Sequence, residues 1–220
     1  MSDTSLILYT NPMSRGRIAR WMLEEVGCHY ETRLVEYGPA MKSPDYLAVN
    51  PMGKVPAIRH GDTVVTEAAA ICAYLADAFP DSGLAPAPGN TTRGPYYRWL
   101  FFAAGPGEAA ITAKSLGLLA PPEKAGQAGY GTFDDVVDAL EKAVESGPYV
   151  CGDQFTAADV YVGSQIGWGM MFGTLPRRPA FEGYFGRLAQ RPASVRAREL
   201  DDALMEEVQN RPQVQRPEAS

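Results

Sequence analysis

The stretch that decides the fold of this chain lies between residues 50 and 58 and reads Asn50-Pro51-Met52-Gly53-Lys54-Val55-Pro56-Ala57-Ile58. Pro56 has no N–H to donate to a sheet, so it marks the start of a short strand. A cis peptide bond between Val55 and Pro56 would turn the N–H and C=O of Val55 outward. Both groups would then be free to pair with an extended peptide, as in strand addition. Only about 5–6% of X-Pro bonds are cis, so this pattern by itself does not establish a site for a small peptide ligand.

A second motif follows at Thr66-Glu67-Ala68-Ala69-Ala70-Ile71, where the apolar periodicity predicts the start of a helix. The unpaired N–H groups of a helix N-terminus bind anions, so they can receive the α-carboxylate of a ligand. Glu67 can then pair with the ligand's α-ammonium, and one site would hold a zwitterionic amino-acid end. The alternative is that Glu67 only complements the helix dipole.

Short apolar or alternating runs occupy the chain on both sides of these motifs. They predict strands over residues 6–9, 30–35, 55–59 and 63–65, and helices over residues 18–26, 43–49 and 66–78. The order is β-α-β, a connection, and then β-β-α. The first helix joins two parallel strands, and the last two strands form an antiparallel pair.

The composition changes at Pro80–Asn90, which holds three prolines and two glycines and therefore predicts a linker. After this stretch only helical patterns remain, over residues 92–104, 133–144, 158–171, 180–190 and 193–209. We expect a mixed α/β domain over residues 1–80, a linker over 81–91, an all-helical domain over 92–210 and a disordered polar tail over 211–220.

Composition excludes several classes of function. The 220 residues carry a net charge of -6, which argues against non-specific nucleic-acid binding. No run approaches the ~18 apolar residues of a membrane span, and Met1–Thr4 has no basic stretch that would begin an export signal. We therefore expect a cytoplasmic protein that binds neither nucleic acid nor membranes. The cysteines, Cys28, Cys72 and Cys151, are far apart and only two histidines are present, so we expect neither a disulfide framework nor a metal site.

The run from residue 50 to 58 together with residues 66–75 resembles the glutathione transferase superfamily. In that family the valine before a cis-proline pairs with the cysteinyl backbone of glutathione, which implies this role for Val55 and Pro56. The acidic residue after the fourth strand binds the γ-glutamyl end, which implies this role for Glu67. A serine usually follows it, whereas this chain has Ala68, so the hydroxyl contact is lost and only the N–H remains.

The resemblance also implies cationic partners for the glycyl carboxylate of glutathione. Lys54 matches a position that often reaches this carboxylate, and Lys42 is a weaker candidate. A second resemblance covers residues 152–159, where Thr156 and Asp159 have the spacing of a capping box at a helix start. This second motif is structural rather than catalytic.

The similarity implies a fold and an activity for the whole chain. The expected fold is an N-terminal thioredoxin-like domain followed by a C-terminal helical bundle, with glutathione as cosubstrate and a twofold homodimer as the assembly. The expected reaction is attack of the glutathione thiol on an apolar electrophile bound between the domains. Candidate walls of this pocket are Trp99, Phe102, Trp168 and Phe172, each of which can instead be a core residue. Two alternatives stay open: a glutathione-dependent reductase of disulfides or peroxides, and a non-catalytic glutathione-binding or regulatory protein.

A thiol activator is expected in the turn after the first strand. The turn resembles that of bacterial and fungal classes with a serine here, which makes Ser14 the first candidate to donate a hydrogen bond to the thiolate. Ser14 can instead be a plain helix N-cap. Tyr9 ends the first strand, as the catalytic tyrosine does in some animal classes, and is the second candidate. Arg15 or Arg17 can add positive potential, or each can be an ordinary solvated charge.

Overall fold

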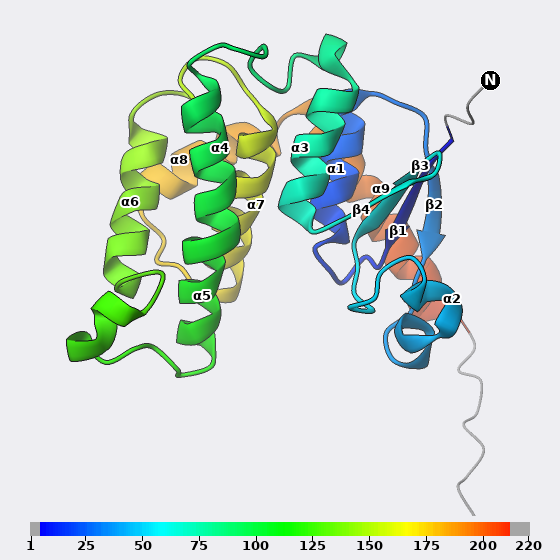
Figure 1. The fold of residues 1–220 in the computed structure, drawn as a ribbon, viewed down its shortest axis with the longest axis horizontal. Helices are drawn as coiled ribbons and strands as arrows, with labels where there is room; N and C mark the ends of the chain where they lie inside the picture. The colour runs from blue at the N-terminus through cyan, green and yellow to red at the C-terminus, as the bar shows by residue number, and fades with distance from the viewer. Residues whose placement is uncertain (1–4, 212–220) are drawn as a thin grey trace, which may run out of the picture.

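The computed structural model of the protein describes residues 5–211. Within them, β1 (Leu6–Thr10), β2 (Glu31–Leu34), β3 (Ala57–His60) and β4 (Thr63–Thr66) form a four-stranded sheet in the order β2-β1-β3-β4. β1 and β2 are parallel, whereas β1–β3 and β3–β4 are antiparallel. The predicted β-α-β and β-β-α units are therefore confirmed, as Figure 1 shows. The tail predicted over residues 211–220 lies, apart from Arg211, outside the described residues.

The sheet has two covered faces because the side chains of β1 alternate. Leu6 and Leu8 pack against α1 (Gly16–Val26) and α3 (Ala68–Ala78) in the main core. Ile7 and Tyr9 join a smaller cluster on the opposite face. That cluster is covered by the 3₁₀-helix η1 (Pro39–Lys42) and by α2 (Pro44–Leu47), which supply Met41 and Tyr46. This packing holds β1 between two layers, so the turn that follows it is placed by the core.

The first helix ends where the sequence predicts. Its apolar face carries Ile18, Trp21 and Met22, all of them buried. Gly27 has φ 73° and its N–H donates to the carbonyl of Leu23 at 3.0 Å, which closes the helix in a left-handed cap.

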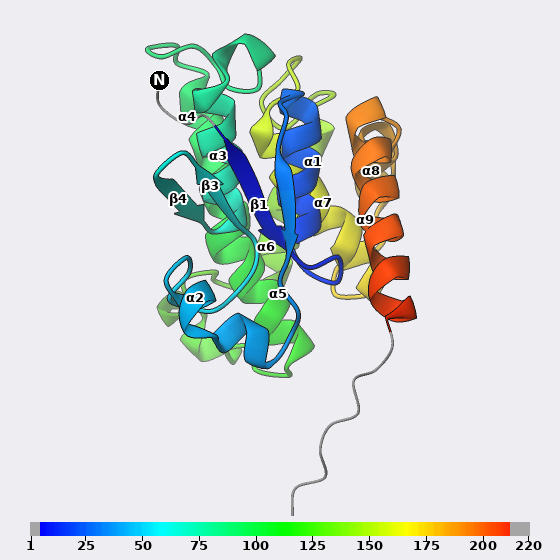
Figure 2. The same cartoon turned by 90° about the vertical axis from the view of Figure 1, so that its right-hand side faces the viewer.

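All the elements after η2 (Pro80–Ser82) that the structure describes as regular are helical. They are α4 (Arg93–Phe102), α5 (Glu108–Ser115), η4 (Pro122–Gln127), α6 (Phe133–Glu145), α7 (Ala157–Phe172), α8 (Pro179–Ala189) and α9 (Pro192–Asn210). Residues 83–92 contain no helix or strand, and the linker over residues 81–91 stays a prediction. Figure 1 shows α4 to α8 as a bundle beside the sheet domain, and Figure 2 shows α9 alongside α1.

One feature of the helical region was not predicted. The helix expected to end near residue 104 continues through a π-helical turn, η3 (Ala103–Gly107), directly into α5. Pro106 lies inside this turn and cannot donate a backbone hydrogen bond, so the wider turn accommodates it without breaking the helix. As a result α4 and α5 form one long rod facing the sheet domain.

The predicted capping box at the start of α7 is confirmed and has further partners. Asp159 is fully buried and accepts hydrogen bonds from the N–H groups of Thr156 and Val150, each at 2.9 Å, and from the hydroxyl of Tyr184 at 2.8 Å. Burial raises the pKa of Asp159 despite these hydrogen bonds. The carboxylate therefore ties α7 to α8 and to the preceding loop.

Candidate active site

A cleft of about 790 Å³ lies between the sheet domain and the helical bundle. The sheet domain lines it with the turn from Pro12 to Arg17 and with Lys54 and Val55. The bundle lines it with Ile111 and Thr112 of α5, Trp168 and Phe172 of α7, and Met205 of α9, among others.

A smaller cavity of about 330 Å³ adjoins this cleft. Glu67, Ala68 and Pro56 line it from the sheet domain, whereas Glu108 of α5 and Tyr161 of α7 line it from the bundle. Arg15, Lys54 and Val55 line both cavities. An extended tripeptide centred on Val55 can therefore place one end in the small cavity and the remainder in the cleft.

The Val55–Pro56 peptide bond is cis, as predicted. The carbonyl of Lys54, just before it, accepts hydrogen bonds from the Tyr46 hydroxyl at 2.7 Å and the Asn50 side chain at 2.8 Å. Gly53 has φ 57°, and a Cβ there would collide with the backbone oxygen of Met41. These contacts hold the segment before Val55, whereas the Val55 N–H and C=O have no hydrogen-bond partner among residues 5–211.

Glu67 stands immediately before α3, with its side chain exposed and its backbone at φ 66°. Among residues 5–211, Glu67 is the one residue other than glycine that has a positive φ. Such conformations are uncommon outside glycine, asparagine and aspartate and cluster at functional sites. Its carboxylate makes no capping bond to α3, so it is available to a ligand in the small cavity.

Ser14 lines the cleft and its hydroxyl is already engaged in the turn. Its Oγ accepts from the Gly16 N–H at 2.9 Å and donates to the Asn11 carbonyl at 2.7 Å. The same carbonyl also accepts from the Ser14 N–H at 3.0 Å. Turning the hydroxyl proton toward a bound thiolate would therefore leave the Asn11 carbonyl with a partner and the oxygen in place.

Tyr9, the second candidate activator, lines neither cavity. Its ring is buried on the α2 side of the sheet, 5.9 Å from the ring of Tyr46 between centroids. The alternation of β1 puts it on the same face as Ile7, and its position does not bring the hydroxyl to the Ser14 turn.

The two candidate arginines of the turn have different partners. Arg15 Nη2 lies 2.5 Å from Glu108 Oε1, so this pair bridges the two domains. Arg17 Nε donates to the Pro12 carbonyl at 2.6 Å, and its Nη1 lies 2.8 Å from Asp202 of α9. Arg17 is thus committed to the turn and to α9, whereas Arg15 sits between the cavities.

The two candidate lysines also differ. Lys54 lines both cavities. Lys42 lines neither, because its ammonium donates to the carbonyls of Met52 at 2.8 Å and Gly53 at 3.3 Å. Lys42 supports the loop before Val55, and the structure brings only Lys54 to the cavities.

Methionine and aromatic side chains line the cleft beside its polar and charged residues. Trp168 and Phe172 line it as expected, whereas Trp99 and Phe102 pack against each other in the bundle, with ring centroids 5.5 Å apart. Sequence reasoning missed Met13, Met171, Met205 and Tyr37, which also line the cleft. Methionines adapt to ligands of varied shape, so this wall can accept more than one apolar molecule.

The protein's own thiols are poorly suited to chemistry here. Burial raises the pKa of Cys28, of Cys72, and of Cys151 to about 11. None of the three lines the cleft or the small cavity. Among residues 5–211, no cluster of histidine, cysteine and carboxylate side chains can hold a metal ion, and no helix is long and apolar enough to cross a membrane.

The fold and these cavities define a class of protein: a thioredoxin-like domain joined to a helical bundle, with cavities lined by both. Comparison with known proteins agrees with this class. Residues 13–78 match the glutathione S-transferase N-terminal domain, and residues 123–187 match the glutathione S-transferase C-terminal domain.

Individual proteins give the same result. Glutathione S-transferase GstA of Escherichia coli O157:H7 is 30% identical over 167 residues, which cover 74% of this chain and 78% of that protein. A glutathione transferase structure from Methylococcus capsulatus superposes with a TM-score of 0.74 at 30% identity, covering 90% of this chain and 99% of that one. A sphingomonad glutathione S-transferase complexed with glutathione gives 0.70 at 30% identity, with 89% and 98% covered.

The chain therefore belongs to the glutathione S-transferase family. It is a glutathione transferase, and glutathione is its cosubstrate.

Proposed function

We propose that the protein binds glutathione across the two cavities and directs its thiolate at an apolar electrophile held in the wide part of the cleft. The observation that carries this proposal is that one continuous cleft is lined both by Ser14 and by Trp168, Phe172 and the methionines. A nucleophile placed at the turn would thus face an apolar wall at short range, which favours reaction by proximity.

Val55 and Glu67 supply the binding half of this proposal. The free N–H and C=O of Val55 pair with the cysteinyl backbone of the tripeptide, in the manner of an added strand. Glu67 pairs with the α-ammonium of the γ-glutamyl end, and Lys54 with the glycyl carboxylate. These contacts hold the sulfur near the Ser14 turn.

Ser14 supplies the chemical half. A free thiol with a pKa near ~8.5 is only about 3% ionised at pH 7, and lowering this pKa by about two units raises the ionised fraction roughly 25-fold. That change needs about 2.7 kcal/mol, and a hydroxyl hydrogen bond to an anion contributes ~1.5–3 kcal/mol. The thiol proton leaves to solvent, the sulfur forms a bond to the electrophilic carbon, and the leaving group departs with its electron pair.

The two alternatives use the same bound thiolate. In a reductase, the glutathione thiolate would attack a sulfur or oxygen atom of a disulfide or peroxide in place of carbon. The raised pKa values of the three protein thiols favour this mechanism over one through protein cysteines. A binding protein would hold glutathione without ionising it. The methionine-rich and aromatic lining favours conjugation of an apolar molecule.

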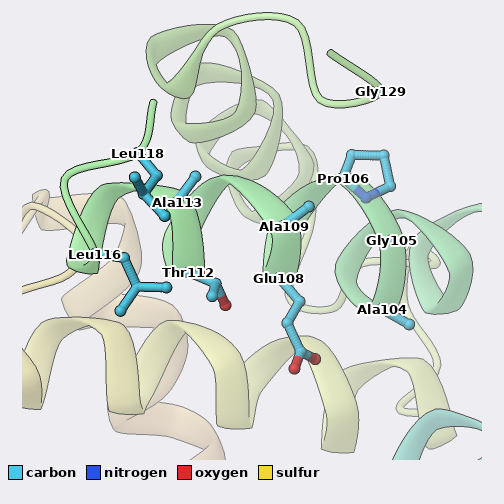
Figure 3. Close-up of a pocket in the computed structure, with 10 residues that line it drawn as sticks. All are labelled: Ala104, Gly105, Pro106, Glu108, Ala109, Thr112, Ala113, Leu116, Leu118 and Gly129. Atoms are coloured by element: carbon cyan, nitrogen blue, oxygen red, sulfur yellow. The ribbon is translucent and has the colours of Figure 1, made fainter. Parts of the chain in front are cut away.

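A homodimer and a cytoplasmic location complete the proposal. The support for the dimer is a set of exposed apolar side chains on α4 and directly after α5, where Phe101, Leu116 and Leu118 are 72%, 64% and 69% exposed. Leu116 and Leu118 line a shallow hollow together with small residues of η3 and α5, which Figure 3 shows: Ala104, Gly105, Ala109 and Ala113. Small residues let a second helix approach closely, and the hollow shares Ala104 and Glu108 with the small cavity. We therefore place a second copy of the chain on this face.

The decisive experiment is a titration of the thiolate of bound glutathione by its ultraviolet absorbance against pH. Ser14→Ala should raise the pKa of the bound thiol by about one to two units while leaving glutathione affinity nearly unchanged, since the hydrogen bond favours the anion. Tyr9→Phe is the control and should leave the titration where it is. A shift in Tyr9→Phe but not in Ser14→Ala would transfer the role to Tyr9.

Turnover with a panel of aryl halides, epoxides, hydroperoxides and mixed disulfides then separates the three activities. Conjugation of the apolar electrophiles supports the proposal. Turnover only with peroxides or disulfides would make the protein a reductase. Glutathione binding without a thiolate near neutral pH would make it a binding protein.

A further inference from the structure

Arg15 belongs to a hydrogen-bonded network that crosses from the sheet domain into the helical bundle. Glu108, its ion-pair partner, accepts from the Tyr161 hydroxyl at 3.1 Å and from the Gln165 side chain at 3.5 Å. Tyr161 and Gln165 are buried on α7. Burial and the nearby Glu108 carboxylate raise the pKa of Tyr161, so its hydroxyl stays protonated and donates.

This network fixes where the Arg15 guanidinium points. A guanidinium has five N–H donors in a rigid plane, and among residues 5–211 Arg15 has Glu108 as its side-chain partner. The other donors are free, and the side chain is 46% exposed. Arg15, Glu108 and Tyr161 all line the small cavity together with Glu67 and Ala68.

We propose that Arg15, held in place by Glu108, binds the α-carboxylate of the γ-glutamyl end of glutathione. This inference rests on the proposed function, and it makes Arg15 a binding residue rather than a thiol activator. Arginine matches a carboxylate with two parallel hydrogen bonds, which makes such pairs strong and directional. Glu108 is the positioning residue, because it orients the guanidinium without itself meeting the carboxylate.

Two features of the cavity favour this assignment. Ala68 can offer a carboxylate its backbone N–H but no hydroxyl, so any side chain that adds to this recognition comes from elsewhere in the lining. The ionic groups of the cavity are Glu67, Glu108, Arg15 and Lys54, and with Glu108 occupied by Arg15 they leave Glu67 to meet the ammonium. The charges of the zwitterionic end then each face an opposite charge.

Arg17 gives a matched comparison two positions along the same turn. It lines the cleft but not the small cavity, and its guanidinium is engaged by Pro12 and Asp202. If positive charge in the turn acts in a general way, glutathione affinity should fall when either arginine is replaced. If Arg15 binds the α-carboxylate, recognition of this group should be lost only when Arg15 is replaced.

The test measures dissociation constants by titration calorimetry for glutathione and for γ-aminobutyryl-cysteinylglycine, the analogue that lacks only the α-carboxylate. In the wild type we expect removal of this carboxylate to weaken binding by at least about tenfold. In Arg15→Gln, glutathione itself should bind about tenfold more weakly, and the analogue should bind nearly as well as glutathione. Arg17→Gln should keep the wild-type ratio between the affinities for glutathione and for the analogue. Arg15→Lys keeps the charge but not the planar guanidinium with its paired donors, so it should recover part of this ratio.

Each other outcome contradicts the assignment in a distinguishable way. Full discrimination in Arg15→Gln would place the α-carboxylate elsewhere. Unchanged affinity with a raised pKa of the bound thiol would make Arg15 an activator of the sulfur. A third ligand is a control: glutaryl-cysteinylglycine lacks only the α-ammonium. It should bind more weakly than glutathione by the same factor in the wild type and in Arg15→Gln, and a different factor would contradict the assignment. A wild type that fails to bind glutathione at millimolar concentration would overturn the proposed function itself.

Discussion

Arg20 on α1 and Asp201 on α9 form a buried ion pair, with Arg20 Nε 2.7 Å from Asp201 Oδ1 and side chains only 4% and 1% exposed. The guanidinium also donates to the hydroxyls of Tyr30 at 3.2 Å and Thr32 at 3.1 Å. Asp201 Oδ2 has no hydrogen-bond partner among the described residues. The pair therefore joins the last helix of the bundle to the first helix of the sheet domain, at the cost of one unsatisfied buried oxygen.

The first prediction concerns this pair. Asp201→Leu leaves Arg20 buried without its counter-charge and should lower the free energy of unfolding by ~3–5 kcal/mol. Arg20→Met should cost a similar amount, whereas the double variant should recover most of the loss, since both charges are gone. Urea denaturation of the four proteins measures these values. Additive losses in the double variant would mean that the two side chains act independently.

More exposed ion pairs continue the contact between α1 and α9 on both sides of the buried one. They are Arg191–Glu25 at 2.7 Å, Arg196–Glu24 at 2.8 Å and Arg17–Asp202 at 2.8 Å. The acidic end of α1 thus faces the basic start of α9, and the basic start of α1 faces acidic residues further along α9. This charge pattern fixes the direction of α9 and brings Met205 to the cleft wall.

The second prediction is a pH dependence that comes from Asp159. Burial raises its pKa, so the folded protein keeps a proton on Asp159 above ~pH 4, where the unfolded chain has lost it. The contribution of this group to stability is therefore complete at low pH and falls as the pH rises through the folded-state pKa. Asp159→Asn removes hydrogen bonds and should have a lower free energy of unfolding than the wild type. The difference between the two proteins should become smaller as the pH rises.

Denaturation of wild type and Asp159→Asn between pH 4 and pH 7 measures this difference. Asp153→Asn, at an exposed position in the same loop, controls for the loss of one carboxylate from the chain. A deficit that widens with pH would show that the ionised form of Asp159 stabilises the fold.

The third prediction concerns assembly. If a second copy covers α4 and α5, Phe101→Asp should convert the wild-type dimer into a monomer, because it places a charge in an apolar contact. Phe172→Asp is a matched control, because Phe172 is also 72% exposed but lines the cleft, so it should leave the dimer intact. Light scattering on the three proteins decides the matter. A monomeric wild type would exclude the proposed interface.

Local patterns in the sequence predicted part of the site, and tertiary contacts decided the rest. The placement of Glu67 at a helix start follows from a motif of a few residues, whereas the cis bond at Val55–Pro56 could be predicted only with the family resemblance. Tyr9 is different, because alternation separates it from Leu8 but does not say what covers each face of the sheet. Its face is covered by η1 and α2, and its side chain lines neither cavity.

The network around Arg15 could not be predicted at all. Glu108 is far from Arg15 in the sequence, and Tyr161 and Gln165 are further still. Their meeting depends on the π-helical turn at Ala103–Gly107, which carries the helix past Pro106 and sets the direction in which Glu108 points. A proline within a helical pattern normally predicts an end or a kink, so a continuous helix through Pro106 could not be expected from the residues alone.

The last prediction tests the role of Glu67. Glu67→Gln keeps the size of the side chain but removes the charge that meets the α-ammonium of glutathione. Losing one partner of a desolvated charge pair typically costs ~2–5 kcal/mol, so we expect affinity to fall by at least about tenfold, which corresponds to ~1.4 kcal/mol. Asp62→Asn, an exposed carboxylate in the β3–β4 turn, changes the net charge equally and should leave affinity unchanged. Calorimetric titration of the three proteins with glutathione gives the values. Equal affinities in all three, with the fold retained, would reduce Glu67 to a charge that complements the dipole of α3.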